Sequence, residues 1–225
     1  MTAAPAAADG FAAALRAAAE PAWSQAVQHR FVRELAADTI DDAAYARYLV
    51  LDYGFIETLV GLVGHAVGTA PGMAAKTRYA QFLSVLTSEE NDYFLRAFRA
   101  LEVPEARWQA PPDHPVLRGF RELMGAAARS GDYARILSVL LPVEWIYLSW
   151  ASAARDSRPG RFYLAEWIDL HVEPAFADFV AWMGQQLDAT GAVLGERDKA
   201  ELTAAFCRAV ELEVAFFDAA YACDD

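Results

Sequence analysis

The chain has 225 residues, of which 56% are hydrophobic, and its 19 Lys and Arg residues against 31 Asp and Glu residues give a net charge of -12. So apolar a sequence predicts a folded core rather than a disordered chain, and its negative charge would repel nucleic acid and anionic membranes. Its two cysteines, Cys207 and Cys223, lack the spacing of a disulfide framework or a zinc site. We therefore expect a cytoplasmic protein that binds neither nucleic acid nor membranes.

The N-terminal segment predicts no targeting signal. It is rich in alanine but has no basic stretch followed by an apolar core, as a signal peptide would. Residues 1–9 are expected to be flexible. No run of about 20 uncharged apolar residues follows, which argues against a membrane span.

Apolar residues recur at three- and four-residue steps through most of the chain, which predicts helices. The segments with this rhythm are 45–64, 82–101, 136–153, 176–187 and 202–221. Residues 39–42 (TIDD) resemble an N-terminal cap for the helix after them, and Gly and Pro interrupt the rhythm near 70, 110, 131, 159 and 193. Without period-two alternation, repeats or long linkers, residues 1–225 predict one all-α domain, a bundle of seven to eight helices.

Three acids lie on faces that helical geometry turns inward: Asp52, Glu144 and Glu213. Each has an aromatic residue one turn further along the chain, namely Phe55, Tyr147 and Phe216. A buried carboxylate is unfavourable unless it is paired or hydrogen-bonded, so three with the same layout indicate a polar pocket. Structural ion pairs remain an alternative for any single acid, and Glu211 competes with Glu213 for the inward position.

Other candidate sites have weaker support. The four histidines, His29, His65, His114 and His171, form neither HExxH nor a repeated Glu-x-x-His pattern, so no metal site is expected. Cys207 stands four residues before Glu211 and could be a thiol near a base, but a buried free cysteine more often acts as a small hydrophobic residue. Glycine-rich phosphate loops and GxSxG are absent from the sequence.

Segments along most of the chain resemble the TenA (thiaminase II) family. Residues 29–35 (HRFVREL), 39–40 (TI) and 45–52 (YARYLVLD) are similar to the family's opening, HPFV…L…GTL…F..YL.QD. Residues 140–147 (LLPVEWIY) are similar to its LLPCxxxY segment, residues 163–168 to its Tyr and Trp-Ile segment, and residues 213–220 to its E..FW..A segment. The resemblance runs from about residue 20 to residue 221.

The resemblance implies an all-α bundle of the haem-oxygenase type that needs no cofactor and forms a homo-oligomer, either a dimer or a tetramer. It also implies hydrolysis of an aminopyrimidine in thiamin salvage, with an aminomethyl-pyrimidine, its N-formyl derivative or thiamin as the substrate. By the same resemblance, Glu144 and Glu213 would be the catalytic pair. The substrate-binding residues implied are Asp52, Phe55, Phe120, Tyr147, Tyr163 and Phe216.

The chain departs from the family pattern at several positions. Val143 stands where the larger branch has its nucleophilic cysteine, and Glu144 matches a glutamate of a second branch that lacks the cysteine. The chain therefore resembles the glutamate branch. Asp38 replaces a glycine, Leu51 a glutamine and Phe120 a common tyrosine, so the identity of the substrate is less firmly implied than the fold.

Two other functions stay open at this stage. A chain without the cysteine could bind a pyrimidine without cleaving it, as a regulatory or scaffolding protein. A haem or di-iron oxygenase on the same fold would need a histidine ligand or a carboxylate and histidine set, for which His29, or Glu57 with His65, are the candidates.

Overall fold

The structure of the protein, a computed structural model, describes residues 10–222. The segment 1–9, for which flexibility was predicted, and Cys223 lie outside the described residues. Everything reported below concerns the described part.

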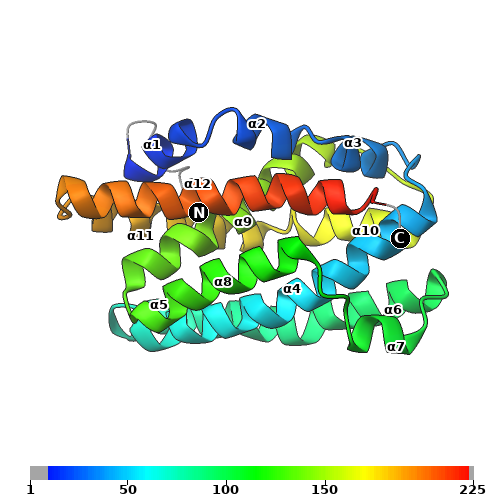
Figure 1. Ribbon diagram of the computed structural model, residues 1–225, viewed down its shortest axis with the longest axis horizontal. Helices are drawn as coiled ribbons and strands as arrows, with labels where there is room; N and C mark the ends of the chain where they lie inside the picture. Colours follow the sequence, from blue (N-terminus) through cyan, green and yellow to red (C-terminus); the bar gives the residue numbers. More distant parts are fainter. Residues whose placement is uncertain (1–9, 223–225) are drawn as a thin grey trace.

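The described residues form helices throughout, without strands, so the predicted all-α class is confirmed (Figure 1). The helices are α1 (Phe11–Ala18), α2 (Ala22–Val27), α3 (Arg30–Ala36), α4 (Asp42–Thr69), α5 (Gly72–Val85), the π-helical turn η1 (Leu86–Glu90), α6 (Asn91–Ala100), α7 (Glu105–Gln109), α8 (Pro115–Ser130), α9 (Tyr133–Ala154), α10 (Phe162–Leu170), α11 (Pro174–Gly191) and α12 (Glu196–Ala219).

The predicted count of seven to eight helices was wrong, because several helices are too short for an apolar rhythm to reveal them. The first three helices have 8, 6 and 7 residues, and α7, with 5 residues, lies inside the proline-rich break near residue 110. The long helices begin and end close to the predicted interruptions.

Local capping chemistry sets the ends of the long helices. The carboxylate of Asp41 accepts hydrogen bonds from the amides of Ala43 and Ala44 at 2.9 and 3.2 Å, within the segment predicted as a cap. Asp132 caps α9 in the same way, through the amide of Ala134 at 2.8 Å. Gly131, at φ 63°, ends α8 in the left-handed conformation that glycine adopts without strain.

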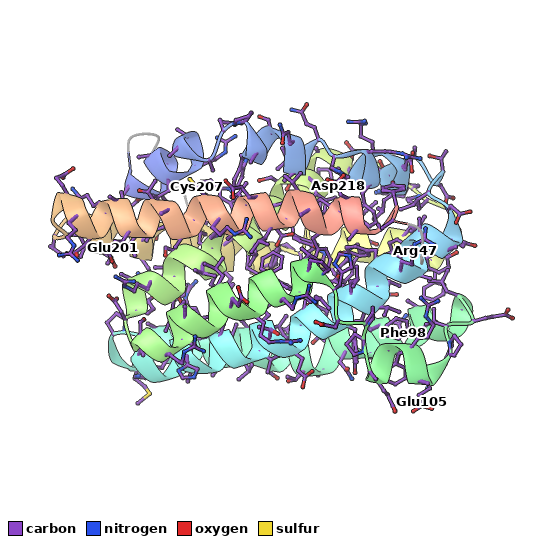
Figure 2. All side chains as sticks on the ribbon, viewed as in Figure 1. Arg47, Phe98, Glu105, Glu201, Cys207 and Asp218 are labelled. Atoms are coloured by element: carbon purple, nitrogen blue, oxygen red, sulfur yellow. The ribbon has the colours of Figure 1, made fainter. Side chains whose placement is uncertain are left out.

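The long helices α4, α8, α9 and α12 pack against one another in the middle of the bundle, and α1 and α2 lie along one side of α12 (Figure 1). Arg47 of α4 donates a hydrogen bond from Nε to the carbonyl of Ala220 at 3.0 Å, which ties α4 to the end of α12 (Figure 2). Asp218 lies on the side of α12 that faces the N-terminal helices and meets His29 Nε2 at 3.1 Å. Residues far apart in the sequence therefore share one core.

Two helices, α4 and α9, are long and apolar enough to cross a membrane by length and composition alone. Core helices of soluble proteins pass the same test, and 72% of the apolar window of α9 is buried inside the bundle. Packing against α11 and α12 accounts for the apolar surface of α9 without a membrane.

Asp38 occupies the position at which the TenA pattern has a glycine, and it adopts the backbone conformation that a glycine would. Its backbone has φ 58°, in the region that favours glycine, and an aspartate tolerates it better than most residues. The Asp38 carboxylate also accepts hydrogen bonds from the Gly160 amide and from Arg161 Nε, both at 2.6 Å. These contacts link the loop before α4 to the loop before α10.

Candidate active site

A cavity of about 490 Å³ opens between α4, the α5–η1 segment, α9, α10 and the start of α11. Aromatic side chains form much of its wall, among them Phe55, Phe82, Tyr147 and Phe176. This volume exceeds what a single pyrimidine ring fills, and it lies within the range of small-molecule sites.

Three buried carboxyl groups line this cavity: Asp52 from α4, Glu90 from η1 and Glu144 from α9; the exposed Glu89 and Glu173 also belong to its lining. They are 2%, 9% and 7% exposed. Glu213 of α12 is 1% exposed and is not part of the cavity lining, yet the charges of Asp52 and Glu144 act on it. The three acids that the sequence singled out therefore lie in one region, and a fourth joins them.

The inward position of α12 belongs to Glu213 and not to Glu211. Glu211 is exposed and pairs with Arg208 three residues earlier, at 3.3 Å. The sequence left this choice open, because a helical face is uncertain by about one residue when only spacing defines it.

All four buried carboxyl groups hold their protons more tightly than usual. Burial is the main cause, and it raises the pKa of Asp52 to about 7 and that of Glu144 to about 8. The charge of Asp52 adds to the effect on Glu144, and the charges of both raise the pKa of Glu90 and Glu213 well above the ordinary value. Near neutral pH, the group therefore holds a mixture of acid and carboxylate forms.

Asp52 is the buried acid that loses its proton most readily, and part of it has no partner. The Tyr48 hydroxyl lowers the pKa of Asp52 as a hydrogen-bond donor, which opposes the effect of burial. Tyr48 also shares a hydrogen bond of 2.9 Å with the hydroxyl of Tyr147. Oδ2 of Asp52 is buried without a hydrogen-bond partner among the described residues, so a ligand donor that reached it would satisfy a buried polar atom.

His171 lines the cavity and was missed as a site residue by the sequence reasoning. Its Nδ1 lies 2.8 Å from the carbonyl of Trp167, so Nδ1 carries the proton and Nε2 keeps its lone pair. Burial lowers the pKa of His171 to about 4, and its ring lies 4.9 Å from that of Tyr147. The spacing of four residues from Trp167 could have indicated that His171 lies on the same inward face. However, His171 follows the end of α10, where helical spacing no longer applies.

The predicted aromatic residues occupy different places. Phe55 and Tyr147 line the cavity, whereas the described lining does not include Phe120, Tyr163 or Phe216. Phe120 and Phe216 pack against the Phe55 ring, with centroid distances of 4.8 and 5.7 Å, and so hold it from behind. The Tyr163 hydroxyl donates to Asp42 at 2.8 Å, near the loop before α4.

No group of three or more His, Cys, Asp and Glu side chains in residues 10–222 has an arrangement that would hold a metal ion. His29 of the described chain bonds Asp218, and His65 is exposed. The residues considered for an oxygenase therefore do not assemble into a ligand set.

A family model described as the TENA/THI-4/PQQC family matches residues 16–223. A protein of Halalkalibacterium halodurans named aminopyrimidine aminohydrolase is 25% identical over 217 residues, which cover 94% of this chain and 95% of that protein. A Bacillus subtilis protein of the same name is 21% identical over 211 residues, covering 94% and 89%.

Solved structures of similar proteins share the fold. A TenA homologue from Pyrococcus furiosus superposes with a TM-score of 0.84 at 21% identity and covers 94% of this chain and 100% of its own. A protein titled a TenA family transcription regulator, from Silicibacter sp. TM1040, gives a TM-score of 0.82 at 24% identity, covering 93% and 96%.

Proposed function

The chain belongs to the TENA/THI-4/PQQC family, and from this premise we propose that it hydrolyses an aminopyrimidine in thiamin salvage. The observation that carries the proposal is the group of buried carboxyls, three of which line one aromatic-walled cavity. The names of the relatives from Halalkalibacterium halodurans and Bacillus subtilis support the same reaction. The substrate is an aminomethyl-pyrimidine or its N-formyl derivative.

For the aminomethyl substrate, water attacks the exocyclic methylene carbon, the C–N bond breaks, and the nitrogen leaves as ammonia after taking a proton. For the N-formyl derivative, water attacks the formyl carbon, the bond from that carbon to nitrogen breaks, and formate is released from the protonated amine. One group must accept a proton from water, and another must donate one to the nitrogen. Glu144 is the base, because it loses its proton before Glu213, whose pKa the charge of Glu144 raises further. We assign the acid to Glu213, which lies behind the described lining and would pass its proton to the nitrogen through a bridging water. Asp52 binds the amino edge of the ring, and its Oδ2 has no partner among the described residues.

The cavity lining described in residues 10–222 includes no cysteine. Val143 and Glu144 line the cavity side by side, immediately after Pro142. This arrangement supports placing the chain in the glutamate branch, in which a carboxyl replaces the cysteine. The proposal includes a cytoplasmic homo-oligomer, whose size light scattering after gel filtration would measure.

The test is ammonia or formate release from 4-amino-5-aminomethyl-2-methylpyrimidine and its N-formyl derivative. Glu144→Gln and Glu213→Gln should each lower kcat/KM by at least about 100-fold, the usual scale for a general acid or base. Glu211→Gln, an exposed control on the same helix as Glu213, should retain wild-type activity. For the wild type, kcat/KM should rise with pH as Glu144, with its pKa of about 8, becomes ionised.

Two results would contradict the proposal. Folded wild-type protein that releases neither product from either compound would remove the hydrolase function. Binding of these compounds without turnover would instead favour the pyrimidine-binding or regulatory role. Wild-type rates in both glutamine variants would remove the assigned roles of Glu144 and Glu213 while leaving the reaction.

A further inference from the structure

Glu90 reaches the cavity from the π-helical turn η1, which interrupts an otherwise continuous helix between Gly72 and Ala100. Such turns are rare, contain one residue more than an α-helical turn, and are frequent at functional sites. Both ends of this turn, Leu86 and Glu90, line the cavity. The irregular turn thus belongs to the wall of the site.

The surroundings of Glu90 keep it uncharged. It is 9% exposed and has neither a hydrogen bond nor an ion pair with another described residue. Burial raises its pKa well above the ordinary value, and the charges of Asp52 and Glu144 raise it further. Burial and these charges therefore favour the carboxylic acid form of Glu90, whose O–H can donate a hydrogen bond.

Asp52 and Glu90 together present one acceptor and one donor to the cavity. Burial raises the pKa of both groups, but the Tyr48 hydroxyl lowers that of Asp52 while the charge of Asp52 raises that of Glu90 further, so Asp52 ionises first. The buried Oδ2 of Asp52 has no described partner. A 4-aminopyrimidine has the complementary edge, where an amino N–H donor lies beside a ring nitrogen acceptor. Pairing both groups would give hydrogen bonds to polar atoms for which the described residues supply no partner.

We propose that Glu90 is a further substrate-binding residue, which donates its carboxylic acid proton in a hydrogen bond to a ring nitrogen while Asp52 accepts from the amino group. This role rests on the proposed function, since it assumes an aminopyrimidine ligand. Glu90 thereby distinguishes pyrimidines from amines of the same shape that lack the ring nitrogen. The proton stays on Glu90, so no bond to carbon is made or broken in this contact.

The test compares a donor-keeping variant with an apolar one of similar length, Glu90→Gln and Glu90→Met. Isothermal titration of the full chain with 4-amino-5-hydroxymethyl-2-methylpyrimidine gives the Kd. This compound keeps the 4-amino group but has a hydroxymethyl group in place of the aminomethyl group, so no ammonia can be released from that position. Glu90→Gln should bind within about threefold of wild type, because its amide still donates. Glu90→Met should bind at least about tenfold more weakly, the effect of losing one buried hydrogen bond.

Asp92→Asn is the matched control, because Asp92 is an exposed acid two residues from Glu90 and pairs with Arg96 outside the cavity. Its Kd should equal that of wild type. Thermal denaturation checks that each variant is folded, and Glu90→Ala provides a second apolar variant if Glu90→Met does not fold.

Two outcomes overturn the inference alone. Glu90→Met that binds as tightly as wild type shows that Glu90 makes no contact, and equal losses in Glu90→Gln and Glu90→Met show that a carboxylate, not a donor, is required. Wild-type protein that neither binds the pyrimidine nor hydrolyses its aminomethyl form would overturn the proposed function as well.

Discussion

Asp52 should make the protein less stable as the pH rises, and Asp52→Asn should remove this effect. The pKa of the folded carboxyl is raised from an ordinary 3.8 to about 7, so the folded state retains a proton that the unfolded chain releases. The penalty is absent below pH 3.8, grows as pH increases, and is complete above pH 7. By linkage, it reaches about 4 kcal/mol there and under about 1 kcal/mol at pH 4.

The assay is reversible urea denaturation of wild type and Asp52→Asn at pH 4 and pH 8. The variant should gain about 3 kcal/mol more free energy of unfolding at pH 8 than at pH 4. Asparagine also buries an amide, but that term is the same at both pH values and cancels in the difference. In thermal denaturation, the same difference corresponds to about 6–12 °C for a chain of this size.

The control is Asp156→Asn, because Asp156 is exposed and its substitution should change stability little at either pH. The reasoning is refuted if Asp52→Asn changes the free energy of unfolding equally at pH 4 and pH 8, or destabilises the protein more at pH 8. Either result would mean that the folded protein does not hold the Asp52 proton.

Substitutions at two further positions, Phe216 and Asp38, test the packing behind the cavity wall and the backbone before α4. Phe216→Ala should reduce the free energy of unfolding by about 3–5 kcal/mol, because removal of this buried ring leaves a cavity behind Phe55. A loss under about 1 kcal/mol in urea denaturation would contradict that packing. Asp38→Ala and Asp38→Gly both lose the contact with Arg161, but alanine should be less stable than glycine by about 1 kcal/mol, since φ is 58°. Equal thermal midpoints for these two variants would be inconsistent with a left-handed backbone.

Helical spacing predicted the burial of Asp52, Glu144 and Glu213 because each lies within a long, regular helix. Glu90 satisfies the same test, since it stands four residues after Leu86 and four before Phe94, both of which are buried. It was overlooked because the acids beside it suggest an exposed face. Spacing also cannot reveal a π-helical turn, because its extra residue is set by backbone hydrogen bonding.

Spacing identifies buried faces but does not tell which buried residues border a cavity. Phe55 and Phe216 both lie inside, yet only Phe55 lines the cavity, because the neighbouring helices decide which side of a ring stays open. His171 illustrates the opposite case, a lining residue placed by the chain beyond α10 rather than by a helical face. The sequence therefore predicted some of the residues that are buried at the site, but it did not predict which of them line the cavity.

Val143 has a consequence for its neighbour Glu144. An apolar side chain at this position adds hydrocarbon to the wall beside Glu144 and supplies no charge that would favour a carboxylate, which agrees with burial as the main cause of its raised pKa of about 8. A carboxyl that is mostly protonated at pH 7 is a weak nucleophile in the free enzyme. A substrate ammonium group in the cavity would lower that pKa and leave Glu144 as a base beside the reacting carbon. Activation of water by Glu144 forms no bond between its carboxyl and the substrate, so under the proposed mechanism rapid quench should detect no covalent adduct on Glu144, and trapping of such an adduct would show direct attack instead.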